Sequence, residues 1–328
     1  KSIWIRHCEE HGQVGQSVGS LGYRRTASRT DDHMNIIPPI TITDAMLHYS
    51  NITEPSPAES ALPGYAGAWN SVTTYGLNAI VYTATHKLYK SLQAGNVGQT
   101  PGAVGASTWW LDYGSTERWC VFDAKVGSQA TRAASLTYEI DPGPFDSIAL
   151  LNIEAESITV TVEDIGGAGG TITWNETTLA DGLFTSDVVK TNFLSTFANP
   201  HVTVLISYAA GTAKIGEIVI GLKESLGSTQ YNPAISIIDY SQKEVDTFGN
   251  YSVLERAYSK RLTCQTTILN TDLDETYNTL ANYRARPVVW VGSEDYASMI
   301  VYGFYKDFSI EISYPTVSIC SLEVEGLV

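Results

Sequence analysis

Short runs of apolar residues, many of them alternating with polar ones, recur along the chain and are densest in its last hundred residues. Runs of this length, bounded by turn-forming residues, predict β-strands. In this part of the chain the runs lie at residues 234–238, 251–254, 262–268, 287–291, 298–304, 308–313 and 318–324. Together they predict a sheet of about seven strands.

One helix is predicted among these strands. Asp272 and Glu275 have the spacing of a capping box, and apolar residues up to Leu280 recur at helical spacing. The helix is expected to end near Tyr283. A sheet covered by a single helix predicts an α+β domain, which we assign to residues 227–328 and interpret as an assembly domain.

The preceding part, residues 115–226, has a different pattern of apolar residues. Its apolar runs are short, rich in β-branched residues and separated by turn signals, which is typical of a β-sandwich. Residues 148–151 are apolar throughout and fit an inner strand. We therefore predict a jelly-roll-like β-sandwich here. Its expected strands lie at residues 134–140, 147–152, 157–162, 170–174, 202–208 and 215–222.

Residues 64–114 are rich in aromatic side chains separated by Gly, Asn and Thr. A module of this size with three short strands has a small core, so stacked rings must provide most of its buried area. The order of its aromatic residues and turns, with Pro101-Gly102 before a closing tryptophan, resembles the chitin- and cellulose-binding modules of carbohydrate-binding families 5 and 12. The resemblance implies glycan binding by ring stacking. The candidate binding residues are Trp69, Tyr75, Tyr82, Tyr89, Trp109 and Trp110.

This module departs from the sugar-binding members at one place. In those members a pair of exposed tryptophans follows the strand that ends in the tyrosine, whereas residues 90–94, which follow Tyr89 here, contain no tryptophan. Packing in the core of the module is therefore the alternative role for the six rings.

The first 63 residues contain little regular patterning. Residues 1–33 show neither strand nor helix periodicity, and we expect an irregular leader or an extended arm that orders on a neighbour. Residues 34–63 are expected to form an N-terminal strand segment, with a strand at residues 40–42, and a proline-rich linker.

Composition narrows the classes of function. A net charge of −15 over 328 residues, with no long run of Lys or Arg, argues against nucleic-acid binding. No apolar stretch is long enough to span a membrane, so we predict no membrane insertion. The four cysteines are far apart and lack the spacing of a metal site, and we expect them to be buried thiols of a protein that folds in a reducing compartment.

No group of residues predicts catalysis, a cofactor or a metal site. The carboxylates that border the predicted sandwich are unpaired in the sequence: Asp141, Asp146, Glu154, Glu156, Glu176 and Asp181. Those near the start of the last part are expected to be solvated: Asp239, Glu244, Asp246 and Glu255. The main cationic cluster could be either a contact face for an acidic neighbouring subunit or a solvated strand edge. It comprises Arg256, Lys260, Arg261, Arg284 and Arg286.

Taken in series, five segments resemble a family of tail proteins from long-tailed bacteriophages and prophages, some of which carry the small carbohydrate-binding module. The segments lie at residues 119–127, 145–152, 237–244, 286–290 and 302–310. The resemblance covers most of residues 34–328 and implies a structural virion protein of the distal tail or baseplate. It brings no catalytic residues with it.

This resemblance predicts a non-enzymatic homo-oligomer that assembles in the host cytoplasm and becomes part of the virion. Its partners are expected to be copies of itself, other phage tail proteins and, through the outer modules, host-surface glycans. A free-standing lectin-like adhesin is the alternative. A glycan-degrading enzyme with an accessory module is a further one, which would need two carboxylates placed across a cleft.

Overall fold

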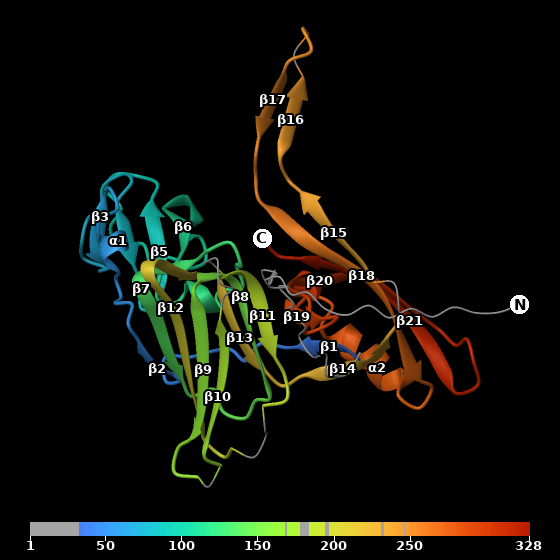
Figure 1. Cartoon of the computed structure of the whole chain (residues 1–328). Coiled ribbons are helices and arrows are strands. Elements are labelled where there is room, and N and C mark those ends of the chain that lie inside the picture. The colour runs from blue at the N-terminus through green and yellow to red at the C-terminus, as the bar shows by residue number, and fades with distance from the viewer. Residues whose placement is uncertain (1–32, 168, 178–183, 194–196, 231–232, 246) are drawn as a thin grey trace, which may run out of the picture. The chain divides into compact units, whose positions relative to one another are not determined.

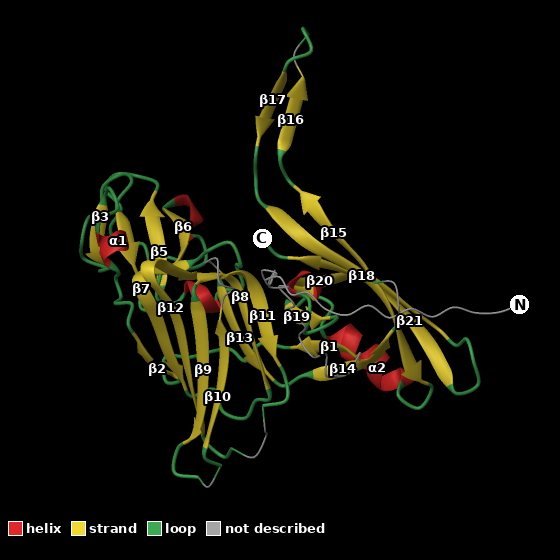
Figure 2. Ribbon diagram, in the orientation of Figure 1, coloured by secondary structure: helices red, strands yellow, loops and turns green. Residues whose placement is uncertain are grey.

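The computed structural model describes residues 33–328, apart from 168, 178–183, 194–196, 231–232 and 246. The chain divides into two units, Lys1–Asp31 and Asp32–Val328. The predicted leader or arm at residues 1–33 therefore lies, except for His33, outside the described residues. The described part consists mainly of strands in several sheets, with two α-helices, which confirms the prediction of a mainly β chain (Figure 1, Figure 2).

A small sheet of four strands follows a short helix near the start of the described part. The elements are α1 (Pro57–Ser60), β3 (Tyr65–Ala68), β4 (Ile80–Tyr82), β5 (Lys87–Ser91) and β6 (Trp110–Ser115). The strand order is β3-β4-β5-β6, with β3 parallel to β4. Three strands were predicted here. The fourth, β3, was not predicted because three of its four residues, Tyr-Ala-Gly-Ala, are small and have low strand propensity.

Eight strands form two facing layers around a common core. They are β2 (Leu47–Ser50), β7 (Ala130–Ile140), β8 (Ser147–Ala155), β9 (Ser157–Asp164), β10 (Thr171–Thr177), β11 (Phe184–Lys190), β12 (Pro200–Ile215) and β13 (Glu217–Gly221). One layer has the order β10-β9-β12-β7-β2, and in the other β8 pairs with both β11 and β13. Leu136 and Val204 of the first layer and Leu150 of the second belong to one buried cluster. Strand β11 was not predicted, because Ser186 and Asp187 interrupt its apolar pattern.

Strand β8 is buried on both faces. Ile148 and Leu150 belong to the core between the two layers. Ala149 and Leu151, which point to the opposite face, pack with Val289 and Ile300 of the next sheet in a separate buried cluster. The prediction of an inner strand at residues 148–151 is thus confirmed.

The third large sheet contains seven strands and closes on itself. Their order is β14 (Glu224–Thr229), β1 (His33–Ile37), β19 (Val288–Val291), β20 (Ile300–Glu311), β21 (Val317–Gly326), β18 (Tyr258–Leu269) and β15 (Ala234–Asp239). Strand β14 also pairs with β18, which completes a circle of six strands. Helix α2 (Leu273–Asn282) contributes Leu280 to the buried cluster inside this sheet, together with Trp290 and Leu322.

Two strand predictions in this sheet need correction. The runs at 298–304 and 308–313 are one continuous strand, β20, since its residues pair with β21 throughout that interval. The first strand lies at His33–Ile37 and not at residues 40–42. Pro38 and Pro39 have no backbone N–H to continue a ladder, so the strand must end before them.

Helix α2 occupies the predicted residues but lacks the predicted capping box. The Asp272 side chain makes no capping hydrogen bond, and its backbone at φ −104° and ψ 4° is not extended. Instead, Thr271 Oγ1 donates a hydrogen bond of 2.8 Å to Asp272 Oδ1. A capping box is found at α1, where Ser56 and Glu59 each accept a hydrogen bond from the other's backbone N–H.

A two-stranded ribbon continues β15 and β18 beyond the seven-stranded sheet (Figure 1). It consists of β16 (Gln242–Val245) and β17 (Tyr251–Leu254), which pair with each other and, among the described strands, with no other. Strand β16 was not predicted, because three of its four residues are polar.

Candidate functional site

Three of the six candidate aromatic residues form the core of the four-stranded module. Tyr75, Tyr89 and Trp110 are at most 7% exposed and belong to one buried cluster. The rings of Tyr75 and Trp110 meet edge to face at 5.5 Å. The Trp110 indole N–H donates to the Gln99 carbonyl at 2.7 Å. Rings covered by protein on this scale cannot stack on a ligand, so these three residues stabilise the module.

The other three candidates, Trp69, Tyr82 and Trp109, are half-buried at its surface. Trp69 and Trp109 pack against the aromatic core with one side. The backbone N–H of Trp69 donates to the Tyr82 carbonyl at 2.9 Å, so these two residues are neighbours. The Trp109 carbonyl instead accepts a hydrogen bond from the backbone N–H of Leu92. The ring surface left for a sugar is therefore that of Trp69, Tyr82 and Trp109.

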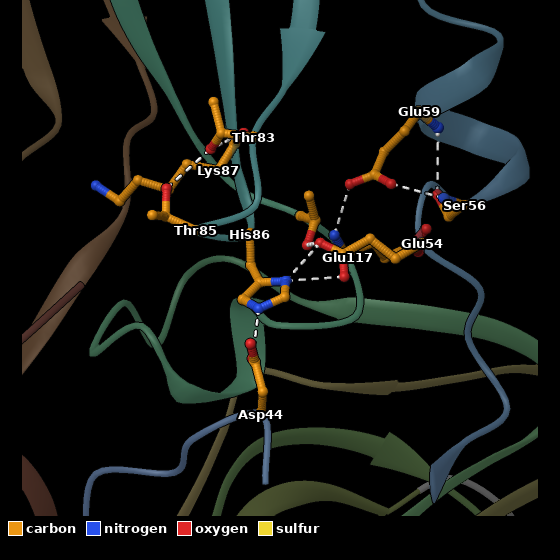
Figure 3. A network of polar contacts seen from close by, with 10 residues as sticks. Asp44, Glu54, Ser56, Glu59, Thr83, Thr85, His86, Lys87 and Glu117 are labelled. Atoms are coloured by element: carbon orange, nitrogen blue, oxygen red, sulfur yellow. Dashed lines mark hydrogen bonds and ion pairs between the residues drawn. The ribbon is translucent and has the colours of Figure 1, made fainter. Parts of the chain in front are cut away.

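A polar contact at the base of the module was not predicted. His86, in the turn between β4 and β5, lies between two carboxylates from outside the module (Figure 3). Its Nδ1 is 2.9 Å from Glu54 Oε2 and its Nε2 is 2.6 Å from Asp44 Oδ1. We call this three-residue contact the His86 bridge.

Two further residues hold the His86 bridge in place. Thr116, just after β6, donates its hydroxyl to Glu54 Oε1 at 2.6 Å. The indole of Trp119 stacks on the His86 ring, with centroids 4.2 Å apart and planes inclined by 19°. Trp119 itself packs against the core of the eight-stranded layers. The bridge therefore joins the module to the segment before it and to the layers after it.

A second chain of hydrogen bonds runs beside the bridge (Figure 3). The buried Glu59 accepts from the backbone N–H of Glu117 at 2.7 Å. The Glu117 side chain accepts from both the backbone N–H and the hydroxyl of Thr131 on β7. Burial raises the pKa of Glu59 above its usual value. The segments that flank the module are thus tied to each other and to β7 by a route that does not use His86.

Exposed apolar side chains gather on the two-stranded ribbon. Residues directly opposite in an antiparallel pair share a face, and successive residues alternate between faces. Val245 pairs with Tyr251, and Lys243 with Val253, so Val245, Tyr251 and Val253 lie on one face. Glu244 and Ser252 pair on the other face, as do Gln242 and Leu254. All of these residues are exposed, so the ribbon has an apolar face that nothing in the described chain covers.

Two residues of the predicted cationic cluster, Lys260 and Arg261, form ion pairs within the described chain. Lys260 Nζ forms an ion pair with Asp187 of β11 and donates to the carbonyls of Ala297 at 2.7 Å and Ile300 at 3.2 Å. Arg261, the next residue, pairs with Glu323 of β21. Lys260 thus ties the β8–β11 layer to the seven-stranded sheet.

The carboxylates considered for hydrolysis take part in local structure. Asp141 lies 2.6 Å from His201 Nδ1, and Glu154 lies 2.8 Å from Lys214 Nζ. Asp146 accepts hydrogen bonds from Ser147 Oγ and from the backbone N–H of Lys223. Glu156 accepts one from the backbone N–H of Ala209, and Glu176 accepts one from the indole N–H of Trp174. Asp181, like Asp246, lies outside the described residues.

A cleft of about 610 Å³ lies between the β8–β11 layer and the seven-stranded sheet. Leu151, Tyr302 and Leu327 line it together with the Lys260–Asp187 ion pair. Among the described residues, no group of three or more His, Cys, Asp or Glu side chains is placed to hold a metal ion. Cys120, Cys264 and Cys320 are free and buried, as predicted for them.

Comparison with known proteins adds no family. No protein-family model matches the chain, and no match was found among curated proteins. Over residues 33–328 with the stated gaps, neither helix has the length and apolar character needed to cross a membrane.

Proposed function

We propose that this protein is a structural, non-enzymatic subunit of the tail tip or baseplate of a long-tailed bacteriophage. In this proposal residues 227–328 assemble with further copies of the chain and with other tail proteins. The small module, similar to carbohydrate-binding families 5 and 12, and the jelly-roll-like layers of residues 115–226 are displayed by that assembly. Half-buried Trp69, Tyr82 and Trp109 are the residues through which the module would contact host-surface glycans.

The observation that carries the proposal is the uncovered apolar face of the β16–β17 ribbon. An isolated two-stranded ribbon is marginally stable in water. Val245, Tyr251 and Val253 lie on one face and are all exposed, Tyr251 by 77% and Val253 by 60%. Apolar side chains that gather on one exposed face mark a protein contact. A repeated contact between identical subunits covers such a face in every copy.

Strand β15, which leads into the ribbon, supports the same interpretation. Ile235 and Ile237 are exposed on it, and Tyr258 is exposed on the facing β18. Exposed apolar residues thus occur both on the ribbon and on the two strands that lead into it. A stable interface buries on the order of 1,600 Å², and residues on both elements suit it better than the ribbon alone.

A pair of matched variants tests the proposal. Tyr251→Lys with Val253→Lys adds two positive charges to the apolar face of the ribbon. Gln242→Lys with Ser252→Lys adds the same two charges to the opposite face. By sedimentation velocity we expect the wild type and the second variant to be oligomers and the first variant to be a monomer with an unchanged circular dichroism spectrum.

A wild-type protein that stays monomeric at micromolar concentration would contradict the proposal. If that monomer also bound host cells, a free-standing lectin-like adhesin would explain the chain better. Immunogold labelling of tail tips on intact particles separates the two by location. Release of reducing sugar from host envelope by the purified protein would instead indicate the glycan-degrading alternative.

A further inference from the structure

The contacts at the base of the module come from four separate stretches of the chain. Asp44 precedes β2, Glu54 belongs to the linker before α1, His86 lies in the module, and Trp119 follows it. The Asp44 side chain is largely exposed, whereas those of His86 and Glu54 are 24% and 15% exposed. The backbone also links these stretches, since Thr116 N donates to the His86 carbonyl at 2.8 Å.

The number of protons on His86 decides how many of these contacts can exist. A neutral imidazole has one N–H, and its other nitrogen is an acceptor. Both ring nitrogens of His86 face a carboxylate oxygen, at 2.6 and 2.9 Å. Ionised carboxylates can only accept hydrogen bonds. The complete bridge therefore requires the imidazolium form, which donates to Glu54 and to Asp44 at once.

The charged groups in contact with the ring are both carboxylates. Glu54 and Asp44 contact it, and Glu59 and Glu117 belong to the same polar network (Figure 3). Lys87, the nearest cation along the chain, forms an ion pair with Asp112 at 2.7 Å. The stacked Trp119 ring also suits a cation on its face.

We propose that the His86 bridge is a proton-operated latch that fixes the small module against the segment before it and the layers after it. With a proton on each ring nitrogen, both carboxylates are held and the module is locked. When His86 has lost one proton, one nitrogen is an acceptor facing an anion, and the contact to one carboxylate is lost. The Glu59–Glu117–Thr131 contacts, which join the segments flanking the module to β7, remain. The module also keeps its covalent connections, so it loosens but stays attached.

This latch does not depend on the proposed function. It predicts that the mobility of the module differs between the doubly protonated and the neutral form of His86. If the module does bind a ligand on its outer surface, the latch would set how rigidly that surface is presented. The prediction concerns residues 80–90 of the module and residues 112–119, which lead from the module into the layers after it.

Hydrogen–deuterium exchange of the full chain tests the latch. After correction for the intrinsic effect of pH on exchange, we expect protection of residues 80–90 to fall on the order of tenfold from about pH 5.5 to about pH 8.5. In His86→Gln the fall should disappear, because glutamine has the same donors at both pH values. The matched control is His201→Gln. His201 also contacts a carboxylate, that of Asp141, but both residues lie in the eight-stranded layers.

A second variant keeps the test decisive if His86→Gln fails to fold. Asp44→Asn with Glu54→Gln leaves the histidine in place and offers it neutral partners that can donate as well as accept, so the pH dependence should again be lost. Imidazole ¹⁵N shifts provide an independent measurement, and both nitrogens of His86 should be protonated at about pH 5.5. Equal protection of wild type at both pH values, or a wild-type response in either bridge variant, would overturn the proposal.

Discussion

Glu217 shows how strongly burial can act on a single residue. It lies at the start of β13, is 3% exposed, and its Oε1 accepts a hydrogen bond of 3.3 Å from Ala124 N. Its Oε2 has no hydrogen-bond partner among the described residues. Burial raises its pKa from 4.5 to about 9. The folded protein therefore holds a proton on Glu217 at neutral pH that the unfolded chain releases.

The elevated pKa of Glu217 predicts a pH-dependent loss of stability. Because the folded value lies above the unfolded one, the contribution is fully present below pH 4.5 and is lost as pH rises towards about 9. Relative to Glu217→Gln, the wild type should lose up to about 1.4 kcal/mol of unfolding free energy per pH unit in this interval. Urea unfolding at several pH values measures the difference. Glu163→Gln, at an exposed position of β9, should show the same pH dependence of unfolding free energy as the wild type.

Residue identity alone predicts less about the candidate site than about the core. The aromatic residues of segment 64–114 could be assigned to one module, since their order and turns are visible in the sequence. Which rings stay exposed depends on how β5 and β6 pack, and no local signal encodes it. The His86 bridge was missed for a related reason. Its partners Glu54 and Asp44 lie 32 and 42 residues away, and a single histidine among acidic residues has no recognisable spacing.

At the scale of elements, periodicity predicted well wherever an apolar face is buried. Helix α2 and strands β18 and β21 bury alternate or helical positions, and their patterns were visible. Prediction failed for strands whose sequence lacks an apolar pattern produced by burial of one face. Strand β16 is exposed on both faces and β3 is built of small residues, so neither carries the periodicity of a core. Of the ribbon, on which the proposed assembly depends, only β17 was thus predicted from the sequence.

Contacts between sheets can be tested through Lys260. Its ammonium pairs with Asp187, whose side chain is 13% exposed, and donates to two carbonyls at the edge of the cleft. Lys260→Met removes a cation from a partly buried carboxylate and from both carbonyls, so we expect a loss of about 2 kcal/mol or more in unfolding free energy. Lys306→Met removes a more exposed cation from Glu323 and Glu325 and should lower the unfolding free energy much less, because water screens this ion pair. Equal effects in a denaturant titration would contradict the bridging role.

At the scale of the whole molecule, the closed sheet depends on a strand from the opposite end of the described chain. Strand β1 lies between β14 and β19, and its Met34 and Ile36 are fully buried with Trp290. No pattern within residues 227–328 predicts that β1 is needed, because nearly two hundred residues of other sheets separate β1 from them.

The dependence on β1 predicts how fragments behave. Residues 223–328 alone lack β1, and the open gap between β14 and β19 should prevent cooperative folding. Joining residues 33–37 to the front of this fragment by a short turn should restore a thermal transition, as monitored by circular dichroism. The control is the joined fragment with Met34→Asp and Ile36→Asp, which places charges in the buried cluster. A cooperative transition in the fragment without β1 would refute the prediction.

The pairing of β1 with β14 has a consequence for how such a protein can change. The two strands are antiparallel neighbours, and Ile36 lies opposite Glu224. The chain therefore leaves the closed sheet and returns to it at adjacent points, with everything between them inserted as one block. A genetic exchange with one crossover just after β1 and the other just before β14 would replace the inserted block in a single recombination event. The protein would acquire a new inserted block while the seven-stranded sheet kept its fold.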